Sequence, residues 1–156
     1  MEYLWAPWRS EYIHMEKSEG CIFCLGAKEA DDRSGILYRG EKNFVIMNKY
    51  PYNPGHLMVA PYRHIASPEN FTPEELADHY EIVRKCLKAL REAFKPQGFN
   101  IGMNLGKVSG AGIDTHIHTH IVPRWQGDTN FMPLIAETKV VSESLSAVYE
   151  KLKERF

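Results

Sequence analysis

The spacing of apolar residues predicts short strands in the first half of the chain and again after residue 98. Residues 36–38, 44–47 and 56–60 form short apolar runs, with turn-forming segments between them at 39–43 and 48–55. From Phe99 to Asn104, Phe, Ile and Met alternate with Asn and Gly, which is also typical of a strand. The pattern therefore predicts a sheet of several short strands.

A long helix is predicted between these two groups of strands. Thr72 fits the cap position, Pro73 suits the first helical position, and Glu75 completes a capping box. Apolar residues then recur at helical spacing at positions 76, 80, 83, 87, 90 and 94. The helix is expected to run to about Phe94 and to end before Pro96.

A second helix is expected over residues 142–155, beginning at Ser142 and carrying apolar residues at positions 145, 148, 149 and 152. On the long helix, Cys86 is expected in the core, whereas His79 is expected at or near the surface without a chemical role. Strands joined by short turns, followed by helices, predict an α+β fold. Its antiparallel sheet is expected to carry the helices on one face.

Composition and charge narrow the class of protein. A chain of 156 residues with 44% apolar and 25% charged residues fits one soluble domain, residues 1–156. The net charge of -1 shows no excess of basic residues of the kind that binds phosphate backbones, so no nucleic acid polymer is expected as a partner. No apolar run approaches the ~20 residues that span a bilayer, and no apolar leader begins the chain, so a cytoplasmic protein without a membrane partner is expected. The aromatic segment 1–13 is expected to pack on the domain or on a partner subunit.

Three histidines alternate along residues 115–122. The residues between and after His116, His118 and His120 are β-branched, which favours a strand with all three imidazoles on one face. Buried imidazoles make a poor core face, because each ring needs a hydrogen-bond partner. The plainer interpretations are a solvent-facing strand that is rich in histidine and a simple metal-binding face.

The residues around this strand indicate chemistry at phosphorus. Imidazole is a nucleophile and a proton shuttle near neutral pH, and His118 is the central ring, so we expect it to attack. Glycines in the preceding loop, residues 106–112, let backbone N–H groups approach an anion. Attack at an α-phosphorus would form a phosphoramidate, while His120 and His56 bind oxygens or protonate the leaving group.

Two of the three cysteines form the sequence Cys21-Ile-Phe-Cys24. This spacing allows two thiolates to bind one zinc ion, but it supplies only half of a tetrahedral site. The other use of the motif is redox chemistry, which needs a helix start that the sequence does not indicate here.

Taken together, these segments resemble the histidine triad family. Residues 116–120 match its H-x-H-x-H motif, Pro54-Gly55-His56 and the apolar run after it resemble a second family segment, and His64 follows Pro61 at the family spacing. Residues 4–9 and 123–132 look like the diadenosine tetraphosphate phosphorylase branch, and Pro123-Arg-x-x-Gly-Asp128 also resembles the fragile histidine triad hydrolases. The resemblance implies a HIT-like fold and a homodimer with one continuous sheet.

The resemblance also implies roles for particular residues. His118 would take the nucleotidyl group, and His120 and His56 would contact the phosphate. Asn48 matches a position that holds the ribose hydroxyls, and Asn104 lies near a position that contacts phosphate. The purine pocket would be walled by Ile22, Phe23 and Ile46, each of which has the alternative of being a core residue.

One segment departs from the family pattern. Many relatives carry Gly-Gln or Gly-Gln-Ser before the triad strand, whereas this chain has Gly110-Ala-Gly112-Ile. The phosphate contacts are therefore expected from backbone N–H groups at Gly110 and Gly112, from Ser109 or from Lys107. Lys107 has the alternative of being a solvated loop residue.

Zinc-bearing relatives supply the rest of the metal site. Carried over to this chain, their ligands are Cys21, Cys24, His64 and His116, a closed set typical of structural zinc. The alternative is a reduced, metal-free site. The expected function is a hydrolase or transferase that cleaves a nucleoside α-phosphate linkage in a dinucleoside polyphosphate, with adenine as the expected base. An adenylate-amine phosphoramidase and a nucleotide-binding regulatory module with little turnover are the alternatives.

Overall fold

A five-stranded antiparallel sheet organises the molecule. The computed structural model describes residues 20–28, 34–128 and 143–156. The strands lie in the order β1-β2-β3-β5-β4, and every neighbouring pair is antiparallel. Their bounds are β1 (Ile36–Arg39), β2 (Asn43–Met47), β3 (Leu57–Pro61), β4 (Gly98–Met103) and β5 (Thr119–Arg124). The α+β fold and the strands before residue 104 are thus confirmed.

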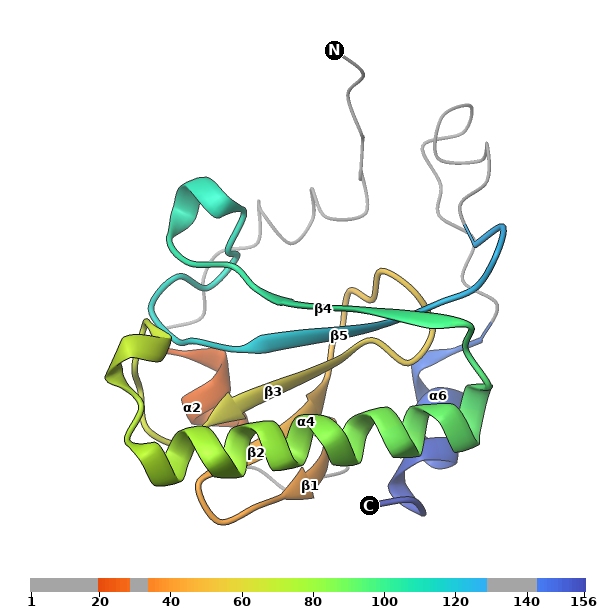
Figure 1. Cartoon of the computed structure of the whole chain (residues 1–156), viewed down its shortest axis with the longest axis horizontal. Helices are drawn as coiled ribbons and strands as arrows, with labels where there is room; N and C mark the ends of the chain where they lie inside the picture. The colour runs from red at the N-terminus through yellow and green to blue at the C-terminus, as the bar shows by residue number, and fades with distance from the viewer. Residues whose placement is uncertain (1–19, 29–33, 129–142) are drawn as a thin grey trace.

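The long helix α4 (Pro73–Phe94) crosses one face of the sheet (Figure 1). Its predicted capping box is present: the Thr72 hydroxyl accepts from the Glu75 backbone N–H at 3.2 Å, and the Glu75 carboxylate accepts from the Thr72 N–H at 2.9 Å. These bonds satisfy two of the backbone donors that a helix start leaves without partners. The helix ends at Phe94 and is followed by Lys95, which adopts a left-handed conformation just before Pro96.

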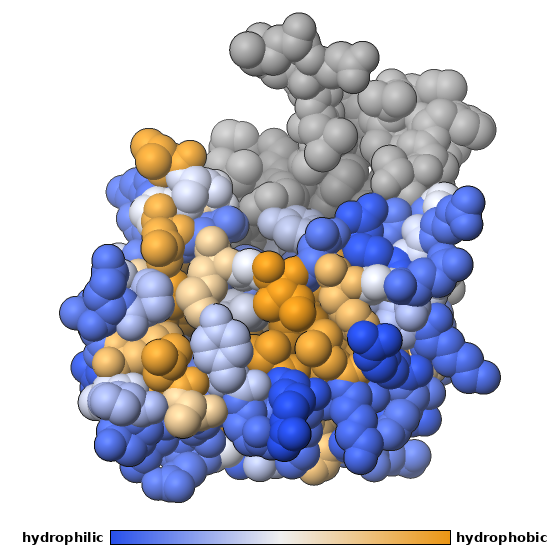
Figure 2. Space-filling view, in the orientation of Figure 1, coloured by the Kyte–Doolittle hydropathy of each residue, from blue (hydrophilic) through white to orange (hydrophobic). Residues whose placement is uncertain are grey.

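The main core lies between this face and the helices. Val45, Leu57, Val59 and Ile121 project from alternate positions of β2, β3 and β5, and Cys86 lies among the residues of α4 that cover them. Cys86 is fully buried, as predicted. The C-terminal helix α6 (Leu145–Lys153) completes this core with Val148 and Leu152. In the space-filling view, hydrophilic residues dominate the lower part of the helix-covered face, and apolar residues gather near its middle (Figure 2).

The opposite face of the sheet is also covered. The short helix α2 (Ile22–Gly26) places Phe23 against Phe44, Ile46 and Met58, which point away from α4. Because both faces are covered, every residue of β2 and β3 is buried. The two predicted helices, α4 and α6, therefore pack on one face as expected, and α2, which the sequence did not predict, covers the other face.

Two helix predictions need correction. The terminal helix is capped by Ser144, whose hydroxyl accepts from the Ala147 N–H at 3.2 Å; Ser142 lies outside the described residues. On α4, Tyr80 is 63% exposed while His79 is fully buried. The buried face of the helix is therefore rotated about the helix axis from the predicted face. His79 is tolerated inside because it has hydrogen-bond partners there.

Two single-turn helices, η1 (Pro68–Asn70) and η2 (Lys107–Ser109), lie in the connecting loops. The aromatic segment 1–13 and residues 129–142 fall outside the described part of the chain. Within the described part, no helix has both the length and the apolar character needed to cross a membrane.

Candidate functional site

Four predicted metal ligands come from three separate segments and meet at one place. Cys21 caps α2, Cys24 lies in its first turn, His64 follows β3, and His116 precedes β5. Their ligand atoms all lie within 4.8 Å of one another. The Cys pair therefore lies at a helix start, which the sequence did not indicate.

Four of the six distances between ligand atoms in this cluster match the edges of a tetrahedral zinc site. The Nδ1 atom of His116 lies 3.3 Å from Cys21 Sγ, 3.5 Å from Cys24 Sγ and 3.2 Å from His64 Nδ1. Cys24 Sγ lies 3.4 Å from His64 Nδ1. Zinc bond lengths for histidine and cysteine give tetrahedron edges of about 3.3 Å between nitrogens and about 3.6 Å from nitrogen to sulfur.

The orientation of His116 is consistent with a ligand role. Its Nε2–H donates to the Pro61 carbonyl at 2.9 Å, which leaves the lone pair of Nδ1 facing the cysteines. Burial lowers the pKa of His116 to about 4, so the ring is neutral at pH 7. A neutral ring with one nitrogen held by a carbonyl is the form in which histidine binds metals.

His118 presents a free lone pair beside this cluster. Its Nδ1–H donates to the His116 carbonyl at 2.9 Å, so Nε2 is unprotonated when the ring is neutral. Burial lowers the pKa of His118, which favours the neutral form. The Phe23 ring lies 4.7 Å from the His118 ring and 5.1 Å from that of His116. The predicted strand is shorter than expected, since β5 begins at Thr119 and the first two histidines precede it.

A chain of hydrogen bonds fixes the proton positions of His56 and His120. The Tyr52 backbone N–H donates to His56 Nδ1 at 3.1 Å, so the His56 proton is on Nε2. That Nε2–H donates to His120 Nδ1 at 2.9 Å, which leaves the His120 proton on Nε2. The rings of His118 and His120 lie 4.8 Å apart. The site therefore combines an unprotonated Nε2 on His118 with an N–H donor on His120.

The predicted ribose and phosphate contacts line different cavities. Asn48 is next to His56, with 3.5 Å between Asn48 Nδ2 and His56 Nε2, and its Oδ1 accepts from the Tyr50 N–H. A separate cavity of about 360 Å³ has His120, Tyr52 and Asn104 in its lining. Asn104 and a histidine of the triad therefore line the same cavity.

The predicted purine walls differ in exposure. Phe23 and Ile46 are buried in the core cluster under α2, whereas Ile22 is 42% exposed. Of the three, Phe23 contacts the triad directly. The loop residues Lys107, Ser109, Gly110 and Gly112 are all exposed, and Gly110 has a positive φ of 86°.

One polar group that sequence reasoning passed over fixes the loop carrying His56. Asn53 donates to the Asp128 carboxylate at 2.7 Å and to the Pro123 carbonyl at 2.9 Å. Arg124 forms a two-pronged ion pair with the same carboxylate at 2.6 and 2.8 Å and holds the pKa of Asp128 far below its usual range. The four-residue spacing of Arg124 and Asp128 was the available signal.

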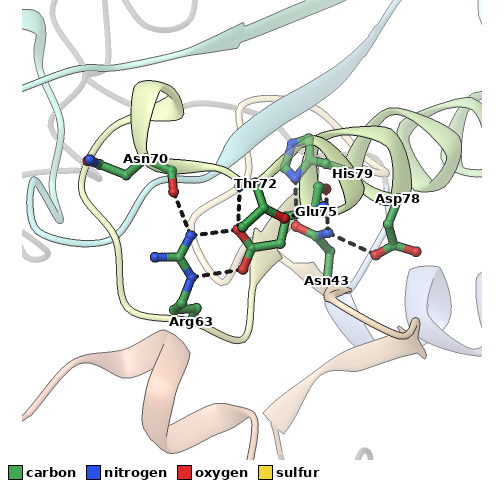
Figure 3. A network of polar contacts seen from close by, with 7 residues as sticks. All are labelled: Asn43, Arg63, Asn70, Thr72, Glu75, Asp78 and His79. Carbon is green, nitrogen blue, oxygen red and sulfur yellow. Dashed lines mark hydrogen bonds and ion pairs between the residues drawn. The ribbon is translucent and has the colours of Figure 1, made fainter.

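A second missed group joins α4 to the sheet, and Figure 3 shows two of its members, His79 and Asn43. Buried hydrogen bonds join His79 of α4 to Asn43, the first residue of β2, and to Thr119, the first residue of β5. The signal in the sequence was weak, because a single histidine in a helix carries no spacing information.

Comparisons with known proteins identify the family. The chain belongs to the histidine triad family, since the HIT domain matches residues 29–127. It is 34% identical over 154 residues to a Mycobacterium tuberculosis protein named AP-4-A phosphorylase, covering 93% of this chain and 79% of that protein. It is 31% identical over 124 residues to the asymmetrical bis(5'-nucleosyl)-tetraphosphatase of Schizosaccharomyces pombe, covering 79% and 68%.

A solved structure agrees with this assignment. The crystal structure of a Zn-bound histidine triad family protein from Mycobacterium smegmatis superimposes with a TM-score of 0.67 at 25% identity, covering 89% of this chain and 94% of the other. The family resemblance and the fold inferred from the sequence are therefore confirmed.

Proposed function

We propose that the protein cleaves dinucleoside polyphosphates at an α-phosphorus, with His118 as the nucleophile. The observation that carries this proposal is the hydrogen bond from His118 Nδ1–H to the His116 carbonyl, which leaves Nε2 unprotonated. The names of two relatives, a phosphorylase of AP-4-A and a tetraphosphatase of bis(5'-nucleosyl) compounds, support the substrate class.

In the first step, His118 Nε2 forms a bond to the α-phosphorus while the bond from phosphorus to the bridging oxygen breaks. The bridging oxygen leaves with the electron pair; with diadenosine tetraphosphate as substrate the leaving group is ATP. The positive charge on the imidazole is stabilised by the His116 carbonyl, which already accepts the Nδ1 proton. His120 Nε2–H donates to an oxygen of the phosphate, an orientation that the bond from His56 maintains.

In the second step, an acceptor oxygen attacks the same phosphorus and the phosphorus–nitrogen bond breaks. The electron pair returns to His118 Nε2, and the proton of the acceptor is released to solvent or to a neighbouring imidazole. Water as the acceptor yields AMP, whereas inorganic phosphate yields ADP. Two steps through a covalent intermediate replace one direct displacement.

We infer that Phe23, Ile46 and Ile22 contact the base and that Asn48 binds the ribose. Phe23 supports this because it already packs against His118, so a base that stacks near it would place its α-phosphate beside Nε2. Asn104 lines the cavity next to His120 and is assigned to the phosphate chain. Lys107, Ser109 and the backbone at Gly110 and Gly112 remain proposed phosphate contacts.

We infer that Cys21, Cys24, His64 and His116 hold zinc. Four protein ligands close the coordination shell, so zinc supplies rigidity at this place and no open position for substrate. The geometry of the nitrogen and sulfur atoms supports this inference. His116 links the cluster to His118 through its carbonyl.

Product analysis tests the proposed function. Diadenosine tetraphosphate is incubated with the protein and with the His118→Ala variant, with and without inorganic phosphate, and nucleotides are separated by ion-exchange chromatography. We expect His118→Ala to lose at least about a thousandfold in turnover, because the covalent step has no replacement. Nucleotide binding by the variant should change little.

Each pattern of products has a distinct meaning. ADP with ATP, formed only with phosphate, indicates a phosphorylase, and AMP with ATP, formed without phosphate, indicates a hydrolase. Turnover retained in His118→Ala would overturn the nucleophile assignment. No cleavage by the unmodified protein would overturn the substrate class, and an adenylate amide is then the next substrate to assay.

A further inference from the structure

Thr119 lies between two histidines of the triad but faces the other side of the sheet. In the register of β3 and β5, Val59 pairs with Thr119 and Met58 pairs with His120. Side chains alternate along a strand, so Thr119 shares the α4 face with Val59 and Ile121 while His120 points to the opposite face. Thr119 is 4% exposed, and its hydroxyl needs a partner on the helix side.

That partner is His79 of α4, which is fully buried. His79 Nε2 lies 2.7 Å from Thr119 Oγ1, and His79 Nδ1 lies 2.9 Å from Asn43 Oδ1. The close-up shows His79 directed from the helix toward Asn43 at the start of β2 (Figure 3). The ring therefore bridges β2 and β5 from beneath the sheet.

The neighbours of Asn43 fix the direction of each bond in this bridge. The Asn43 amide nitrogen donates to the Glu75 carbonyl at 3.1 Å and to the Asp78 carboxylate at 2.8 Å, so Oδ1 is the acceptor and His79 Nδ1–H is the donor. Burial lowers the pKa of His79 to about 4, and the neutral ring has its lone pair on Nε2. The Thr119 hydroxyl must then donate to His79 Nε2.

We propose that His79 is a positioning residue that acts through Thr119 to hold the triad in its reactive geometry. The inference rests on the function proposed above. Thr119 is joined by peptide bonds to His118 and His120. A hydrogen bond that anchors the Thr119 side chain therefore also fixes the backbone position of both neighbours. Burying the His79 imidazole removes it from water, which has a free-energy cost that an apolar residue at this position would not have. The directional bond is the property that an apolar residue could not supply.

Two variants of Thr119 separate the hydrogen bond from packing. Thr119→Val keeps the shape of the side chain and removes the hydroxyl, whereas Thr119→Ser keeps the hydroxyl and removes a methyl group. We expect kcat for diadenosine tetraphosphate to fall about tenfold to a hundredfold in Thr119→Val, because small misplacements of reacting groups have effects of this size. KM should stay within about twofold, since the substrate contacts remain. Thr119→Ser should keep most of kcat.

A control variant and a second measurement guard against a purely structural effect. Cys86→Ala loosens the same helix–sheet core two turns further along the same face of α4, without removing a group of the bridge, and should lower thermal stability while kcat changes less than about twofold. The imidazole nitrogens of His118 and His120 are also observed by ¹⁵N NMR without substrate. In Thr119→Val we expect mixed tautomers where the parent protein has one for each ring.

The outcomes distinguish the two proposals. Parental kcat and parental tautomers in Thr119→Val would overturn the positioning role, as would equal kcat losses in the Val, Ser and Cys86→Ala variants. If the parent protein itself does not cleave the substrate, the proposed function fails, and the tautomer measurement alone decides the positioning role. If Thr119→Val does not fold, His79→Gln replaces it in both measurements, with the same expected and contrary results.

Discussion

At the scale of single residues, the site depends on which nitrogen of each imidazole carries the proton. Backbone groups set this choice at three rings: the His116 carbonyl for His118, the Pro61 carbonyl for His116 and the Tyr52 N–H for His56. A lone pair and a donor placed side by side suit attack on phosphorus with stabilisation of the departing charge. Burial keeps His118 in the neutral form that this assignment needs.

The pKa of His79 determines the direction in which the free energy of unfolding changes with pH. Burial lowers its pKa to about 4 in the folded protein, against 6.5 for the ordinary value. The unfolded chain therefore binds a proton first as pH falls, and the stability present above pH 6.5 is lost progressively down to about pH 4. Asp78, which acts in the opposite direction, only reduces this shift.

We expect this group to contribute a loss of about 2 kcal/mol in the free energy of unfolding between pH 7.5 and pH 5. Urea titrations of the protein and of His79→Gln, which does not titrate, measure the difference. The variant should be less stable at pH 7.5 and should lose less stability on acidification. Equal losses for the two proteins would show that His79 is not a buried neutral ring.

At the scale of elements, the first two turns of α4 connect the cap, the metal-ligand loop and the sheet. Arg63, the residue before His64, donates twice to the Glu75 carboxylate, at 2.8 and 2.6 Å. The Arg63 guanidinium holds the pKa of Glu75 at about 2, so this ion pair persists throughout the pH range of the experiment on His79. The same turns carry Asp78 and His79, which hold Asn43 (Figure 3).

The capping box predicts a measurable effect at this helix start. Thr72→Ala removes the acceptor of the Glu75 N–H and should lower the free energy of unfolding by about 1 kcal/mol. Thr72→Ser retains the hydroxyl and should lose less than half of that. Urea unfolding of the three proteins provides the comparison. Identical midpoints for the Ala variant and the parent would mean that water replaces the cap without cost.

At the scale of the whole molecule, the cluster of two cysteines and two histidines joins parts of the chain that the sheet leaves separate. α2, the segment after β3 and the segment before β5 each supply at least one of the four side chains. The segment before β5 also carries His118, the proposed nucleophile, whose Nδ1–H donates to the carbonyl of His116 in the cluster. The homodimer implied by the family resemblance stays a prediction.

Removal of the metal should lower the thermal stability of the protein more than it changes the rate of catalysis. We expect a strong chelator to extract about one zinc per chain and to lower the melting temperature by several degrees, since a ligand that binds only the folded state stabilises it. Emission spectroscopy gives the metal content and calorimetry the melting temperature. Cys24→Ser is the matched variant: it should melt lower and respond little to the chelator. A melting temperature unchanged by loss of the metal would contradict a structural role.

The sequence by itself determined the local features of this protein. Three kinds of feature depend on residues close together in the chain, so their physical causes are local. They are the capping box and apolar spacing of α4, the short strands and the alternating histidines. The family motifs also lie within short segments, and the Cys21, Cys24, His64 and His116 set could be named from them.

Only the tertiary structure decided the rest, because those features depend on residues far apart in the chain. The side of α4 that is buried follows from the sheet it meets, which is why His79 is inside and Tyr80 is outside. β5 begins later than the β-branched pattern predicted, since His116 turns toward His64 and the two cysteines and His118 bonds back to the His116 carbonyl. Each tautomer in the triad is likewise set by a carbonyl, an N–H or a ring that only the fold brings within hydrogen-bond distance.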